Sequence, residues 1–178
     1  MPLDHISWHT VWTLTKFKDP NDVISKLLKS GMGLLEAIRL FPDKLIGEVT
    51  WDGNVGLNEG IGELIDIICG LGTPTKWDNA DAYLGVGNSA TAPLATQTGL
   101  QGASKEFVIS DVSYPVRSNQ TVEWRATYGT TKANFHWQEY TVVNASDDTG
   151  KNLNRCISDK GTKTNTESWT LSVRITFS

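Results

Sequence analysis

The apolar positions in the first part of the chain follow two different periods. In residues 6–17, apolar and aromatic side chains recur at every second position over most of the segment, which is typical of a half-buried strand. The Asp19-Pro20 pair then predicts a helix start, because aspartate is a preferred N-cap and proline is tolerated in the first turn. Apolar residues at helical spacing continue this helix towards Gly31, and a second helical run covers residues 34–41.

A third helix is predicted over residues 58–69, after a short strand at residues 45–51. Its apolar side chains share one face, which we expect to be buried: Ile61, Leu64, Ile65 and Ile68. Cys69 lies near this face, so we expect a buried thiol there. Glu59 and Glu63 are typical of surface acids that complement the positive end of a helix.

After Gly72 the hydrophobic period changes to two, which predicts a series of strands. The apolar phase shifts within residues 133–143, and this shift predicts a bulge near Gln138 or Glu139. Turn-forming residues follow at 147–150 and 159–161. The alternating segments lie at residues 80–87, 105–112, 121–129, 133–143 and 167–177.

Together these elements predict a mainly β fold: an antiparallel β-sandwich or barrel body with a helical N-terminal region. We expect residues 1–49 to form an N-terminal strand and a helical arm or insertion, packed either on a partner or on their own domain. Residues 50–178 are expected to form a β-rich body that includes helix 58–69. Within this body, residues 87–104 carry no charged side chain and predict a long irregular loop.

Composition narrows the possible function classes. The chain has 178 residues and a formal net charge of -4, so it lacks the basic footprint of a nucleic-acid-binding protein. It has no run of apolar residues long enough to predict a membrane-spanning helix, and its first residues do not match a secretory signal. Two cysteines, Cys69 and Cys156, cannot form a disulfide framework, although one bond between them remains an alternative.

No motif in the sequence predicts catalysis, a cofactor or a metal. Residues 85–90 match a relaxed G-x-G-x-x-A pattern, but the helix that a dinucleotide site requires does not follow them. His5 and His9 are four residues apart on a predicted strand, which separates them too far for a shared metal. The sequence has neither a G-x-S-x-G nucleophile elbow nor a convincing catalytic triad. An enzyme would require the acids Glu59, Glu63, Asp66 and Asp81 to converge.

Seven tryptophans and an uncharged loop instead indicate packing and partner binding. Trp124 and Trp169 alternate in phase with aliphatic residues and are predicted to be in the core. The side chains for which we expect partner contacts are Trp8, Trp12, Val23, Leu27, Leu34, Ile38, Trp51, Trp77, Pro93, Leu94 and Leu100.

The order of several phrases over residues 50–178 resembles a group of tailed-bacteriophage virion proteins of the head decoration (cement) or auxiliary capsid type. The phrases are DGN at 52–54, AYLGVGNSATAP at 82–93, WRATYGTTKANFHWQEYTVVNA at 124–145 and SWTLSVRITF at 168–177. The resemblance implies a β-rich body on the outside of a capsid, often as a homotrimer, with a small arm that reaches a neighbouring subunit.

From this resemblance we expect a non-enzymatic structural protein that stabilises the shell by bridging capsomers. Its expected partners are the major capsid protein and further copies of itself, and it is expected on the virion's outer capsid surface after synthesis in the bacterial host cytoplasm. No cofactor, nucleic acid or membrane is expected. The alternatives are a tail- or fibre-associated protein that binds a host surface or glycan, and a free-standing carbohydrate-binding module.

Overall fold

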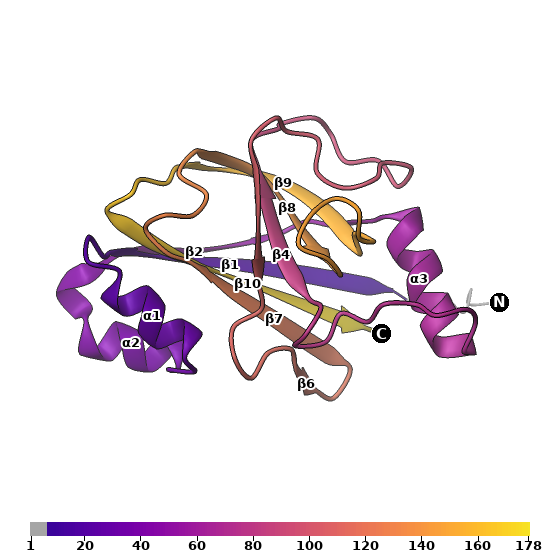
Figure 1. Cartoon of the computed structure of the whole chain (residues 1–178), viewed down its shortest axis with the longest axis horizontal. Helices are drawn as coiled ribbons and strands as arrows, with labels where there is room; N and C mark the ends of the chain where they lie inside the picture. Colours follow the sequence, from indigo (N-terminus) through magenta and orange to yellow (C-terminus); the bar gives the residue numbers. More distant parts are fainter. Residues whose placement is uncertain (1–6) are drawn as a thin grey trace.

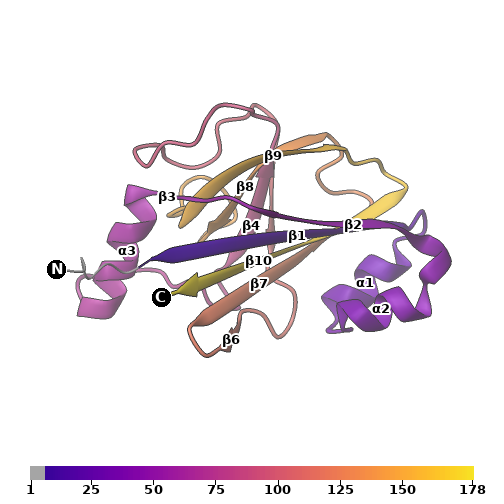
Figure 2. The ribbon, with the colours of Figure 1, turned by 180° about the vertical axis from the view of Figure 1, so that it is seen from behind.

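Two five-stranded antiparallel sheets stack on each other in the computed structural model, which describes residues 7–178 (Figures 1 and 2). The first sheet has the order β2-β1-β10-β7-β6 and the second the order β3-β9-β8-β4-β5. This arrangement confirms the mainly β, sandwich-like prediction. His5 and Ile6, which were predicted to lie on the first strand, are outside the described residues. The strands are β1 (Trp8–Lys18), β2 (Leu45–Asp52), β3 (Val55–Gly56), β4 (Tyr83–Gly87), β5 (Lys105–Ile109), β6 (Val116–Ser118), β7 (Thr121–Tyr128), β8 (His136–Val143), β9 (Asn154–Thr162) and β10 (Glu167–Phe177).

β1 is a central strand of the first sheet. It pairs with β10 along its whole length and with β2 on its other side. Its apolar residues Trp12 and Leu14 are fully buried between the sheets, because the strand alternation turns them inward. The first described element is therefore a strand of the body, and the boundary expected after residue 49 falls inside β2. Within the described residues 7–49, a separate helical N-terminal region is not evident, because the first element is a strand.

Two short helices, α1 (Val23–Lys29) and α2 (Leu34–Leu40), are inserted between β1 and β2 at one end of the sandwich (Figure 1). A short 3-10 turn, Pro42–Lys44, leads from α2 into β2. The helices enclose a second, smaller core whose buried members are Phe17, Ile24, Leu28 and Ala37. This insertion packs on its own chain, which was one of the two alternatives that the sequence left open.

Asp19 organises the start of α1, as the sequence predicts, but from outside the N-cap position. The N-cap residue is Asp22, which makes no capping side-chain hydrogen bond. The buried Asp19 carboxylate instead accepts hydrogen bonds from the backbone N–H groups of Val23, Ile24 and Ser25. It thereby satisfies three donors that a helix start leaves without internal partners.

The main core between the sheets is built around aromatic side chains. The Trp137 ring lies 4.7 Å from the Tyr128 ring and 4.8 Å from the Trp169 ring, both edge to face. Trp124 and Trp169 are buried, which confirms their predicted core positions. None of the seven tryptophans is exposed, so the aromatic content is used for packing.

The remaining elements confirm some predictions and correct others. Helix α3 spans Asn58–Cys69, and a change of register in β8 between Trp137 and Glu139 is the predicted irregularity. The strands β3, β6 and β9 were not predicted. The Asp159-Lys160-Gly161 turn chemistry lies within β9, where Gly161 has φ +83° and the strand departs from regular pairing with β8.

Lys163 fastens the connection between β9 and β10 to the turn after β7. Its buried ammonium donates hydrogen bonds to the carbonyl oxygens of Gly129 and Thr164 and to Asn134 Oδ1. Burial lowers the pKa of Lys163 to about 8, although the charges of Glu167 and Asp22 oppose this shift.

Replacing Asp19 with alanine should lower the free energy of unfolding by about 1–2 kcal/mol, because three helix N–H groups lose their acceptor. Urea unfolding measures this loss. Asn21→Ala is the matched control, since Asn21 is exposed in the same turn. Equal stability of the two variants would contradict the capping role of Asp19.

The free energy of unfolding should depend on pH through Lys163. In the unfolded chain a lysine keeps its proton up to about pH 10.4, whereas folded Lys163 loses it near pH 8, so stability rises with pH between these values. Relative to Lys163→Met, the wild type should therefore gain about 1–2 kcal/mol between pH 8 and 10. Urea unfolding of both proteins at each pH gives the difference, in which the other titrating groups largely cancel. A difference that stays constant would show that folding does not alter the pKa of Lys163.

Candidate functional site

Two of the four acids named above, Glu59 and Glu63, accept hydrogen bonds from the backbone. Glu59 Oε1 accepts hydrogen bonds from the backbone N–H groups of Gly99 and Asn152, and Glu63 Oε1 accepts one from Thr75. Glu59 does lie in the first turn of α3, as predicted, and both half-buried acids also tie this helix to three separate segments. Among residues 7–178, no three or more His, Cys, Asp or Glu side chains come together as a metal site.

Three of the expected partner-contact residues are buried in the chain's own core. Trp12 is fully buried and donates its indole N–H to the Gly53 carbonyl oxygen. Trp77 donates its indole N–H to the Lys151 carbonyl oxygen, and Leu100 is also buried. These three side chains cannot contact a partner in this fold, because the strand register and loop anchoring turn them inward.

The other expected contacts are divided between half-buried and exposed positions. Trp51 stacks on Trp12 and is covered by the Lys160 ammonium, 3.8 Å from the ring centre. Trp8 packs against Phe177. The half-buried set is Trp8, Leu27, Leu34, Ile38, Trp51 and Pro93. Val23 and Leu94 are exposed, at 48% and 59%.

An exposed apolar surface that the sequence did not predict lies on α3. Leu64 and Ile67 pack against the main core, and the rest of the helix's apolar side chains face outward. We call these outward residues, together with Leu71 just after the helix, the α3 apolar stripe: Ile61, Ile65, Ile68 and Leu71, with Ile68 75% exposed. Cys69 is also exposed, which corrects its predicted burial, and neither cysteine forms a disulfide. The helix carries more apolar residues than one face can bury, and this excess is the feature of the sequence from which the exposed stripe could have been predicted.

A second group of exposed apolar side chains lies at the opposite end of the sandwich, on α1 and α2 (Figures 1 and 2). Its members are Val23, Leu35 and Leu40, and Leu35 is 83% exposed. Isolated exposed apolar residues are ordinary on protein surfaces, whereas contiguous apolar patches mark contact surfaces.

The uncharged segment at residues 87–104 is irregular, as predicted, but charged groups beneath it hold it in place. The buried Glu139 carboxylate accepts hydrogen bonds from the backbone N–H groups of Gln101 and Gly102. Arg155, also fully buried, donates its Nε–H to Glu139 at 2.8 Å and its Nη1–H groups to Thr91 O and Gln97 Oε1. This pair fixes both halves of the loop on the outer face of the second sheet.

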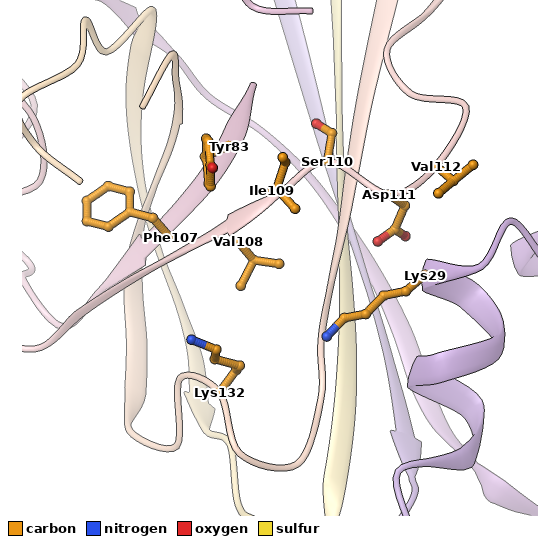
Figure 3. A pocket seen from close by; sticks show the side chains of 9 residues that line it. All are labelled: Lys29, Tyr83, Phe107, Val108, Ile109, Ser110, Asp111, Val112 and Lys132. Carbon is orange, nitrogen blue, oxygen red and sulfur yellow. The ribbon is translucent and has the colours of Figure 1, made fainter. Parts of the chain in front are cut away.

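A hollow of about 390 Å³ follows β5 (Figure 3), and we call it the β5 trough. Its lining is mainly apolar, with Phe107, Val108 and Ile109 from β5 itself. Lys29 reaches it from α1 and Lys132 from the turn between β7 and β8. The complete lining is Lys29, Tyr83, Phe107, Val108, Ile109, Ser110, Asp111, Val112 and Lys132.

Asp111, the one carboxylate among the described residues that line the trough, forms an ion pair with Arg125 inside the protein. Asp111 accepts hydrogen bonds from Arg125 Nε at 2.9 Å and from the Thr127 hydroxyl and backbone N–H. Burial raises the pKa of Asp111, although the positive charge of Arg125 opposes the shift. Asp111 is thus a structural group, and the positive charges at the trough face an apolar floor.

Comparisons with known proteins give no relationship: no family model, curated protein or solved structure matches this chain. Among the described helices, none has the length and apolar content needed to cross a membrane.

Replacing Glu139 with glutamine should lower the free energy of unfolding by about 3–5 kcal/mol, because Arg155 remains buried without its counter-charge. Hydrogen exchange at the amides of Gln101 and Gly102 should also accelerate. The control is Glu106→Gln, which removes the partly exposed Lys132 pair and should cost about 1 kcal/mol or less. Equal losses for the two variants would show that the buried pair does not fasten the loop.

Proposed function

We propose that this chain is a non-enzymatic structural protein of a tailed-phage virion. It binds the major capsid protein on the outer surface of the shell and bridges adjacent capsomers, a role that suits a domain with exposed apolar side chains at both ends. In this proposal the protein assembles as a homotrimer and reaches the capsid after synthesis in the bacterial host cytoplasm.

The observation that carries this proposal is that helices with exposed apolar side chains lie at the two ends of the sandwich. The α3 apolar stripe lies at one end, and Val23, Leu35 and Leu40 lie at the other. A rigid β body between two apolar surfaces can join two neighbouring protein surfaces. Burying what remains exposed on the α3 apolar stripe is worth on the order of 4 kcal/mol before the cost of association is subtracted.

The arrangement of polar groups also favours binding over catalysis. Each buried ion pair described above has both charged partners within the protein and fastens a loop or a helix. The tail or fibre alternative relied on exposed tryptophans that could stack on a glycan, but all seven are buried or half-buried.

Quantitative mass spectrometry of purified virions tests the location directly. We expect a copy number comparable to that of the major capsid protein. A number far below this favours the tail or fibre role, and absence of the chain from the particle rejects both virion roles.

Substitutions at the two helical ends should distinguish binding to the capsid from bridging between adjacent capsomers. Ile68→Glu should reduce occupancy on capsids by about tenfold, which corresponds to about 1.4 kcal/mol, because it places a charge on the α3 apolar stripe. Leu35→Glu should leave much of the occupancy but reduce the resistance of the loaded shell to heat. Ile46→Glu, at an exposed β2 position, is the control. Full occupancy and full shell stability in both helix variants would reject bridging through the helical ends.

A further inference from the structure

The strand β5 has an unpaired side. It is the last strand of the second sheet and pairs only with β4. At either end of this pairing, Ser110 N–H donates to Ala82 O and Asn88 N–H donates to Ser104 O. Because hydrogen-bonded and non-hydrogen-bonded pairs alternate in an antiparallel ladder, the even-numbered residues bond to β4. The backbone groups of Phe107 and Ile109 therefore point to the free side.

The β5 trough lies where an added strand would run. It is lined by the consecutive residues from Phe107 to Val112, and its opposite wall carries Lys29 and Lys132 (Figure 3). Ile109 is 43% exposed, and neighbouring Val112 is 55% exposed. An exposed edge with apolar side chains beside it is a template for pairing with another chain.

The charges at the trough favour an acidic ligand. Lys132 is paired with Glu106 at 2.8 Å, and Asp111 is paired with Arg125. Lys29 has no carboxylate within 4 Å among the described residues, so its charge is available. The other edge strands suit this ligand less well: β3 and β6 have two and three residues, and β2 carries Glu48 and Asp52.

We propose that the β5 trough binds an extended acidic segment of a protein partner as an additional strand. The segment's backbone pairs with Phe107 and Ile109, an apolar side chain enters the trough, and a carboxylate of the segment meets Lys29. In known complexes of this type, backbone hydrogen bonds supply affinity and the side-chain pockets supply specificity. The inference rests on the proposed function only in taking the partner to be a protein.

The test is a titration of the full chain with a capped seven-residue peptide of alternating valine and glutamate, followed by amide NMR. A matched peptide of alternating valine and lysine is the charge control. We expect the glutamate peptide to bind with a Kd of about 1 mM or tighter and to slow hydrogen exchange at the Phe107 and Ile109 amides. The lysine peptide should bind at least about tenfold more weakly.

Two variants and one matched control locate the binding. Lys29→Glu should weaken binding of the glutamate peptide by about tenfold. Lys26→Glu, on the same helix but outside the trough, should leave the affinity unchanged. Ile109→Pro removes an outward N–H without removing a bond to β4, so it should abolish binding while the fold persists. Thermal unfolding and the amide spectrum verify that fold.

Three results would overturn the inference: no binding by the glutamate peptide at about 5 mM, equal binding of both peptides, or equal effects of the two lysine variants. None of these measurements uses a virion, so their failure is distinct from a failure of the copy-number experiment.

Discussion

The buried ion pair between Arg125 and Asp111 fixes how the sandwich, its inserted helices and the β5 trough meet. Arg125 lies on β7 of the first sheet, and Asp111 lies two residues after the end of β5 of the second. The Arg125 Nη2 group also donates to the carbonyl oxygens of Leu28 and Met32, where α1 ends. One side chain therefore holds two sheets and a helix together. Removing either charged partner would leave the other buried without compensation, which makes this junction costly to disturb.

The same junction determines the geometry of the trough. Lys29 is carried by the last turn of α1, whose end Arg125 binds, and the floor is carried by β5, whose end Asp111 fixes. The separation between the positive charge and the apolar floor is thus set by internal hydrogen bonds. The proposed ligand would meet a preformed surface, so association would mainly cost the ordering of the ligand and not of this chain.

Local patterns in the sequence predicted those elements whose hydrophobic period is regular over many neighbouring residues. The strand alternation of β1 and β10 and the helical spacing of α3 all appear at nearly the predicted positions. The role of residues 1–49 could not be predicted this way, because β1 becomes central only through pairing with β10 at the other end of the chain. The same applies to β9, whose turn-forming residues lie within a strand that departs from regular pairing with β8.

The contact residues were harder to predict because burial is a property of the whole fold. Trp12 and Trp77 have the chemistry of interface residues, but both lie in the core, where their indole N–H groups find backbone acceptors. Ile61, Ile65 and Ile68 have the chemistry of core residues, yet the sandwich offers α3 only enough contact for Leu64 and Ile67.

The described surfaces differ in the kind of binding that they can support. The helical ends offer apolar area, which stabilises contact with little directional preference. The trough offers backbone hydrogen bonds and a single charge, which specify orientation and register. Arg155 and Glu139 hold residues 87–104 against the second sheet in the same way that Arg125 and Asp111 hold α1. Both segments are therefore held on the body by a buried ion pair, so the helical end at α1 and α2 and the loop at residues 87–104 have positions fixed by internal hydrogen bonds.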